Sequence, residues 1–76
     1  MFSYNISKNA DNKAFKDVCE KIKKIGDNLT KEEPIVDVDG SVIQTYTKDD
    51  KKIKVYNDYE VDAVYIDSEI DLKGII

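Results

Sequence analysis

The sequence predicts an α+β fold: a two-layer sandwich with one amphipathic helix packed on an antiparallel sheet of about four or five strands, in the order β-α-β-β-β-β. Two observations predict it. Apolar residues recur at helical spacing between Asn12 and Ile25, and residues 34–67 form short apolar-polar alternating runs with a polar turn about every ten residues. Such strands have one dry face, which the apolar stripe of the helix can cover. We expect residues 1–76 to form a single domain.

The first third of the chain predicts a strand and then the helix. Met1–Ser7 alternates at period two and predicts a strand that pairs beside one of the later strands. Asn9 or Asp11 can cap the helix that follows, and Gly26 is the residue type that commonly ends one. Residues 27–33 are expected to form a polar loop. The helical stripe consists of Phe15, Val18, Ile22 and Ile25.

The remaining strands are predicted from β-branched runs and the turns between them. Asp39-Gly40 predicts a two-residue hairpin of type I′, because both central residues of that turn need positive φ. Lys48–Lys51 predicts a four-residue polar turn, and Asn57-Asp58 predicts another. Gly74–Ile76 is expected to tuck against the core. The expected strands are Ile35–Val38, Ser41–Thr47, Lys52–Tyr56 and Glu60–Ile66; Ser68–Leu72 alternates again and is a candidate for a last edge strand.

Composition is typical of a soluble globular domain, with 37% charged and 41% hydrophobic residues. No apolar run approaches the roughly 18 residues of a membrane span, so we expect a cytoplasmic protein without a membrane partner. Cys19 is the single cysteine, which agrees with a reducing compartment. It is expected to be a small hydrophobic residue beside the helical stripe.

The residue types that are missing argue against catalysis. The chain has no histidine, so the usual general base near neutral pH is absent, and no carboxylate stands in an apolar setting that would raise its pKa. We therefore expect no enzyme activity and no cofactor. All 12 basic residues are lysine. Direct binding of nucleic acid is disfavoured, because lysine cannot form the bidentate hydrogen bonds of the planar arginine guanidinium group.

Acidic residues near the hairpin ends are candidate metal ligands. Asp37 and Asp39, with Asp49 or Asp50, could chelate a hard cation, but their spacing does not match a calcium loop. The favoured interpretation is that Asp37 faces water and Asp39 serves the turn. No metal site is predicted.

Charge asymmetry is the main functional signal. Residues 1–33 carry seven lysines and six acids, a net of +1, whereas residues 34–76 carry five lysines and ten acids, a net of −5. Acids there recur at period two, which on a strand makes a row with a spacing of about 6.6 Å. A solvated sheet face would produce the same pattern, because its polar residues also alternate. The candidate partner-binding residues are Asp58, Tyr59, Glu60, Asp62, Tyr65, Asp67, Glu69 and Asp71, with Tyr56 among them.

These observations predict a small acidic, non-enzymatic module that binds another protein by occupying a basic surface. A more specific version of this prediction is that the partner is a nucleic-acid-binding protein. In general type the chain resembles the small inhibitor proteins that phages and mobile elements encode, including nucleic-acid mimics and anti-CRISPR proteins; the resemblance covers no specific residues. The alternative is a structural protein that homo-oligomerises by pairing an edge strand, either Met1–Ser7 or Ile70–Ile76. We expect a monomer or a homodimer.

Overall fold

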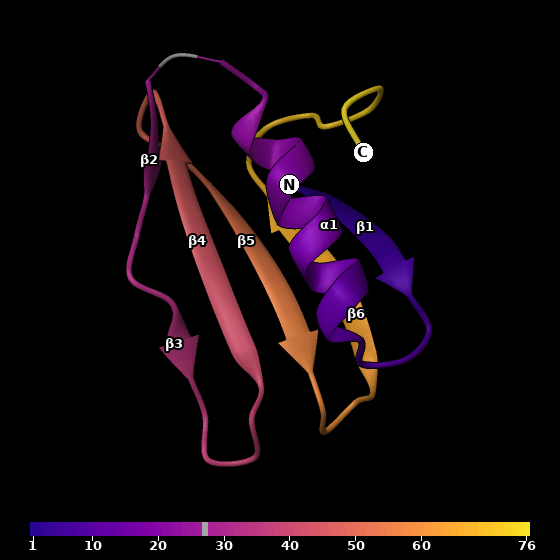
Figure 1. Ribbon diagram of the computed structural model, residues 1–76. Coiled ribbons are helices and arrows are strands. Elements are labelled where there is room, and N and C mark those ends of the chain that lie inside the picture. The colour runs from indigo at the N-terminus through magenta and orange to yellow at the C-terminus, as the bar shows by residue number, and fades with distance from the viewer. Residues whose placement is uncertain (27) are drawn as a thin grey trace.

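The computed structural model describes residues 1–26 and 28–76 and folds them into a helix on an open antiparallel sheet (Figure 1). This confirms the α+β class and the helix-on-sheet arrangement. Over these residues the sheet has six strands, more than predicted. The elements in chain order are β1 (Phe2–Ser7), α1 (Asn12–Lys23), β2 (Leu29–Lys31), β3 (Ile35–Val36), β4 (Val42–Lys48), β5 (Lys51–Asp58) and β6 (Ala63–Ser68).

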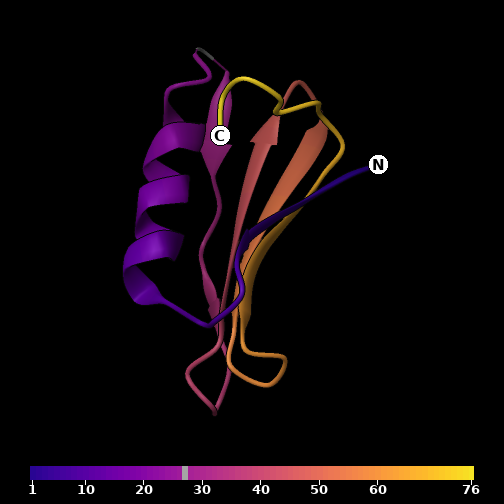
Figure 2. The ribbon, with the colours of Figure 1, turned by 90° about the vertical axis from the view of Figure 1, so that its right-hand side faces the viewer.

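The sheet order places the first strand beside the last. The strands lie in the order β1-β6-β5-β4-β2, and β3 also pairs with β4. Tyr4 of β1 lies opposite Ile66 of β6. The additional strand β2 lies in the segment 27–33, where a loop was expected; residue 27 itself is outside the described residues. Figure 2 shows that α1 covers one face of the sheet and leaves the other face bare.

The helix begins where its capping residue predicts. The Asp11 carboxylate accepts hydrogen bonds of 2.8 and 3.1 Å from two backbone N–H groups of the first turn. Val18 and Ile22 are buried against the sheet, which confirms the orientation of the stripe. The helix ends at Lys23, two residues before the predicted end at Ile25.

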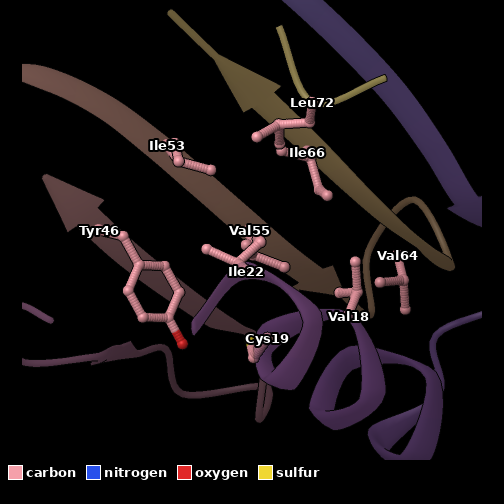
Figure 3. Packing of buried hydrophobic residues seen from close by; sticks show 9 residues of the cluster. All are labelled: Val18, Cys19, Ile22, Tyr46, Ile53, Val55, Val64, Ile66 and Leu72. Carbon is pink, nitrogen blue, oxygen red and sulfur yellow. The ribbon is translucent and has the colours of Figure 1, made fainter. Parts of the chain in front are cut away.

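The core lies between α1 and the sheet (Figure 3). Each fully buried aliphatic side chain contributes about 1.5–3 kcal/mol relative to an exposed one. Cys19 is also buried, as a small hydrophobic residue, and burial raises the pKa of its thiol. Burial likewise raises the pKa of the Tyr46 hydroxyl, which points toward α1 in Figure 3. The buried cluster consists of Val18, Cys19, Ile22, Tyr46, Ile53, Val55, Val64, Ile66 and Leu72.

The β3–β4 loop differs from the predicted hairpin turn, whereas the polar turn predicted at Lys48–Lys51 is present. In the β3–β4 loop, Asp37 N–H donates to the Ser41 carbonyl (2.8 Å), so the loop has three residues, and its single positive φ is +90° at Gly40. The two-residue turn predicted there was wrong. Positive φ at two central residues occurs instead at Asp49 and Asp50, whose φ angles are +51° and +67°. This two-residue turn joins β4 directly to β5.

The segment between β5 and β6 also differs from the prediction. β5 continues through Asp58, where a turn was expected, and β6 starts at Ala63 instead of Glu60. The reason is local: Asp58 Oδ1 accepts hydrogen bonds from the N–H groups of Glu60 (2.9 Å) and Val61 (3.2 Å) and thereby closes a turn over residues 59–62.

The C-terminal segment does not form the candidate edge strand Ser68–Leu72. Ser68 Oγ instead both donates to the Ile70 carbonyl (2.7 Å) and accepts from its N–H (2.9 Å), which turns the chain back over the core. Leu72 is fully buried, and Ile75 and Ile76 pack against the cluster, so the tucked terminus is confirmed. Among the described residues no helix is long and apolar enough to cross a membrane.

Candidate functional site

The uncovered face of the sheet carries a row of large side chains. Residues that alternate with the buried ones point away from α1. Cross-strand pairing aligns four of them across β3, β4, β5 and β6: Ile35 opposite Ile43, Ile43 opposite Tyr56, and Tyr56 opposite Tyr65. The row therefore runs perpendicular to the strands and forms a mixed aliphatic and aromatic surface.

A groove of about 380 Å³ opens beside this row. It lies at the end of the sheet where the β3–β4 and β5–β6 loops are neighbours (Figures 1 and 2). Four acidic residues line it, and no lysine is among the residues that do. We call this site the acidic groove and define it by Ile35, Ile43, Tyr56 and Tyr65 together with Asp37, Asp39, Asp58 and Glu60.

Asp58 is held in one orientation within the acidic groove. Its Oδ1 accepts from the backbone of the 59–62 turn, and its Oδ2 accepts a hydrogen bond of 3.2 Å from the Tyr65 hydroxyl. Burial and the negative charge of Asp58 raise the pKa of Tyr65. The hydrogen bond anchors the carboxylate at the hydroxyl end of the Tyr65 ring.

The two groove tyrosines form a stacked pair. The ring centroids of Tyr56 and Tyr65 are 4.6 Å apart and their planes differ by 11°. Both side chains are half-buried, and burial, with a smaller effect of Asp67, raises the pKa of Tyr56. The pair is a half-buried aromatic element that borders the acidic residues of the groove.

Tyr59 ties the two loops of the groove together. Its N–H donates to Ser41 Oγ (2.9 Å), and its hydroxyl donates to Asn12 Oδ1 (2.9 Å) at the start of the helix. Its ring also lies beside Gly40, within van der Waals distance (3.4 Å) of the position that a Cβ atom would take there. Gly40 is favoured for its positive φ of +90°, and the Tyr59 ring packs beside it. These contacts connect the β5–β6 turn to the β3–β4 loop and to the start of α1, and so hold the rim of the groove in place.

Aliphatic side chains extend the site toward solvent. Ile35, Val36 and Val61 are 62%, 65% and 63% exposed, and Val38 at the tip of the β3–β4 loop is fully exposed. Single exposed apolar residues are normal, but here two of them, Ile35 and Val36, line one groove. The combined surface is apolar at its centre and acidic at its rim.

The structure divides the predicted partner-binding residues. Asp58, Glu60 and Tyr65 come together in the acidic groove, and Tyr59 supports its rim. Asp62 turns toward the β1–α1 connection, where it accepts hydrogen bonds from Asn9 Nδ2 (3.0 Å) and the Ala10 N–H (2.8 Å). Those bonds hold the pKa of its carboxyl below the usual value.

The remaining predicted acids are not among the residues that line the groove. Asp67 is on β6 opposite Lys54 and accepts from Ser3 Oγ (3.0 Å). Glu69 accepts from the Lys52 N–H (2.9 Å), and Asp71 accepts from the Tyr4 hydroxyl (3.0 Å). The expectation of regular acidic rows on strands was therefore wrong, because Glu60, Asp62, Glu69 and Asp71 all lie in turns or loops.

Asp37 and Asp39 are groove residues that the sequence interpretation assigned to solvent and to a turn. Asp39 does serve the turn: it accepts from the Ser41 N–H (2.9 Å), which lowers the pKa of its carboxyl. The sequence did contain a signal that Asp37 and Asp39 would also lie beside the β5–β6 loop. In an antiparallel meander every second loop lies at the same end of the sheet. In the meander of β3, β4, β5 and β6, the β3–β4 and β5–β6 loops therefore had to be at the same end.

No three acidic or thiol side chains among the described residues lie close enough together to hold a metal ion. No protein-family model matches the chain, and no curated protein or solved structure is significantly similar to it. The chemistry of the acidic groove is accordingly the basis of the functional proposal that follows.

Proposed function

We propose that this protein is a small, non-enzymatic module that binds another protein and holds a positively charged segment of it in the acidic groove. One observation carries the proposal: a groove on the bare sheet face has four carboxylates and no lysine among its lining residues, with exposed aliphatic side chains beside it. Aromatic and aliphatic centres with polar rims are characteristic of protein interfaces. The charge of the rim selects a basic partner.

In the sharper form of the proposal, the partner is a nucleic-acid-binding protein and the module acts as an inhibitor of the phage-encoded, anti-CRISPR-like type. Its acids then take the place of phosphates on the partner's basic surface. Asp58, Glu60 and Tyr65 would be central contacts, joined by Asp37 and Asp39. The other sequence-predicted contacts stay predictions: Tyr59, Asp62, Asp67, Glu69 and Asp71.

A neutralised rim tests the proposal. The triple variant Asp37→Asn, Asp39→Asn, Glu60→Gln removes three negative charges, and its amide oxygens can still accept the hydrogen bonds of the β3–β4 loop. We expect partner binding to weaken roughly tenfold at low ionic strength, since an exposed ion pair contributes about 0.2–1 kcal/mol. The salt dependence of binding should also flatten. Quantitative capture from the native cell or its host, at low and high salt, measures both effects.

A matched control distinguishes the effect of the groove carboxylates on binding from the effect of the protein's net charge. Asp17→Asn, Glu20→Gln, Asp50→Asn changes the net charge by the same amount, from −4 to −1, at exposed positions away from the groove. Proteins captured by the wild type and by this control, but not by the groove variant, are partners of the proposed kind. Equal capture by all three proteins at both salt concentrations would reject the acidic groove as the binding site.

A second candidate function, assembly through an edge strand, is favoured by β1. This strand lies at the edge of the sheet and its six residues carry no charge, whereas charged or proline residues usually protect such edges. Residues 70–76, the other expected pairing segment, pack on the core instead. Sedimentation at tens of micromolar should then show a dimer that Asn5→Lys returns to monomer; a wild-type monomer would eliminate this candidate.

A further inference from the structure

The stacked tyrosine pair and the anchored Asp58 carboxylate have a specific geometric relation. Tyr65 donates its hydroxyl to Asp58 Oδ2, so the carboxylate lies at the edge of the ring stack and not above it. A cation that stacks on the outer face of one of these rings can therefore reach the carboxylate at the ring edge. Attraction to the ring faces and to the carboxylate then acts on one group.

The carboxylates retain free acceptor capacity for such a cation. Asp58 Oδ2 accepts one hydrogen bond, from Tyr65, and an ionised carboxylate oxygen can accept about two. Glu60 is exposed, and its side chain accepts no hydrogen bond from the described residues. A ligand with several N–H groups in one plane can bond both residues, whereas a phosphate would be repelled by the four acids of the rim.

The apolar side of the groove suits a long aliphatic stem. Ile35 and Ile43 continue the tyrosine row toward the edge of the sheet, and Ile35 is largely exposed. Lysine and arginine both bury their methylene stems on such surfaces. The end group decides between them, because only the guanidinium is planar, stacks on an aromatic ring and presents a fork of donors.

From these contacts we infer that the acidic groove is a receptor for an arginine side chain of the partner. The guanidinium lies against the Tyr56–Tyr65 pair and donates to Asp58 and Glu60, while its stem packs on Ile43. This inference rests on the proposed function and adds the identity of the side chain that is recognised.

Short capped peptides test this selectivity directly. Each contains the same glycine and serine spacers around two arginines, two lysines or two citrullines. We expect the arginine peptide to bind about tenfold more tightly than the lysine peptide, and the uncharged citrulline peptide to bind least. Calorimetry gives the affinities, and NMR signals of the Tyr56 and Tyr65 rings should shift most with arginine.

The variant Tyr56→Leu removes the stack and leaves the hydrogen bond between Tyr65 and Asp58 in place. It should lower arginine binding to the level of lysine and leave lysine binding within about twofold. The ring shifts of the wild-type protein give an independent reading if this variant folds poorly. Arginine and lysine peptides that bind the wild type equally well would overturn the inference.

The outcomes separate this inference from the proposed function. Equal binding of both cationic peptides that is lost in the Asp37→Asn, Asp39→Asn, Glu60→Gln variant overturns arginine selectivity alone. Binding that this variant does not affect overturns the inference and the proposed groove function together. If neither cationic peptide binds, the arginine receptor is rejected, and the capture comparison decides the proposed function separately.

Discussion

Replacing Leu72 with alanine should lower the free energy of unfolding by about 2–5 kcal/mol, as much as a comparable change within the sheet. Leu72 lies outside every helix and strand, yet it is fully buried in the core cluster. Its N–H donates to the Tyr4 hydroxyl (2.8 Å), which positions it over the sheet. Alanine would leave a cavity that the neighbouring β strands cannot close.

Urea unfolding followed by circular dichroism measures this loss. A chain of this length has a total stability of about 4–11 kcal/mol, so the variant should unfold at a much lower urea concentration. Lys73→Ala is the matched control: the adjacent residue is exposed, and its replacement should change stability by less than about 0.5 kcal/mol. A Leu72→Ala protein as stable as this control would show that the C-terminal segment is not part of the core.

Replacing Asn57 with alanine should cost about 2–4 kcal/mol through lost hydrogen bonds. Asn57 is 1% exposed; its Oδ1 accepts from the Asp11 N–H (3.1 Å) and its Nδ2 donates to Asn12 Oδ1 (2.9 Å). The side chain therefore joins β5 to the start of α1. Asn12 in turn accepts from the Tyr59 hydroxyl, so the same network supports the rim of the acidic groove.

The Asn57 variant should change two readouts together. Chemical denaturation reports the stability, and the NMR signals of Tyr59 report the position of the 59–62 turn. Asn5→Ala, on the exposed edge strand β1, is the control and should alter neither. If Asn57→Ala left Tyr59 unshifted, the network would not connect the helix to the groove.

The fold was predicted well in the segments where a hydrophobic periodicity extends over several residues. The stripe from Phe15 to Ile22 and the alternation of Lys52–Tyr56 both specify which face is buried, and both agree with the structure. Turn geometry was less predictable because single side-chain hydrogen bonds decide it. Asp58 converts an expected strand start into a turn, and Ser68 redirects a candidate edge strand.

The candidate site was predicted only in part for the same reason. Asp58, Glu60 and Tyr65 were identified as an acidic and aromatic cluster and do lie together, whereas Glu69 and Asp71 were grouped with them through a strand that does not form. Asp37 and Asp39 were missed because they are distant in sequence, and only the neighbouring positions of two loops bring them in. Spacing along the chain describes one strand, but a site on a sheet is built across several.

The pairing of β1 with β6 has a consequence for how the chain is made. Residues 2–7 leave the ribosome long before residues 63–68, their partners, have been synthesised. The helix can form early from local contacts, but the sheet edge beside it stays open until β6 emerges. A nascent chain therefore exposes an uncharged, strand-prone segment until β6 has emerged, which makes that segment a site for chaperone binding or premature association.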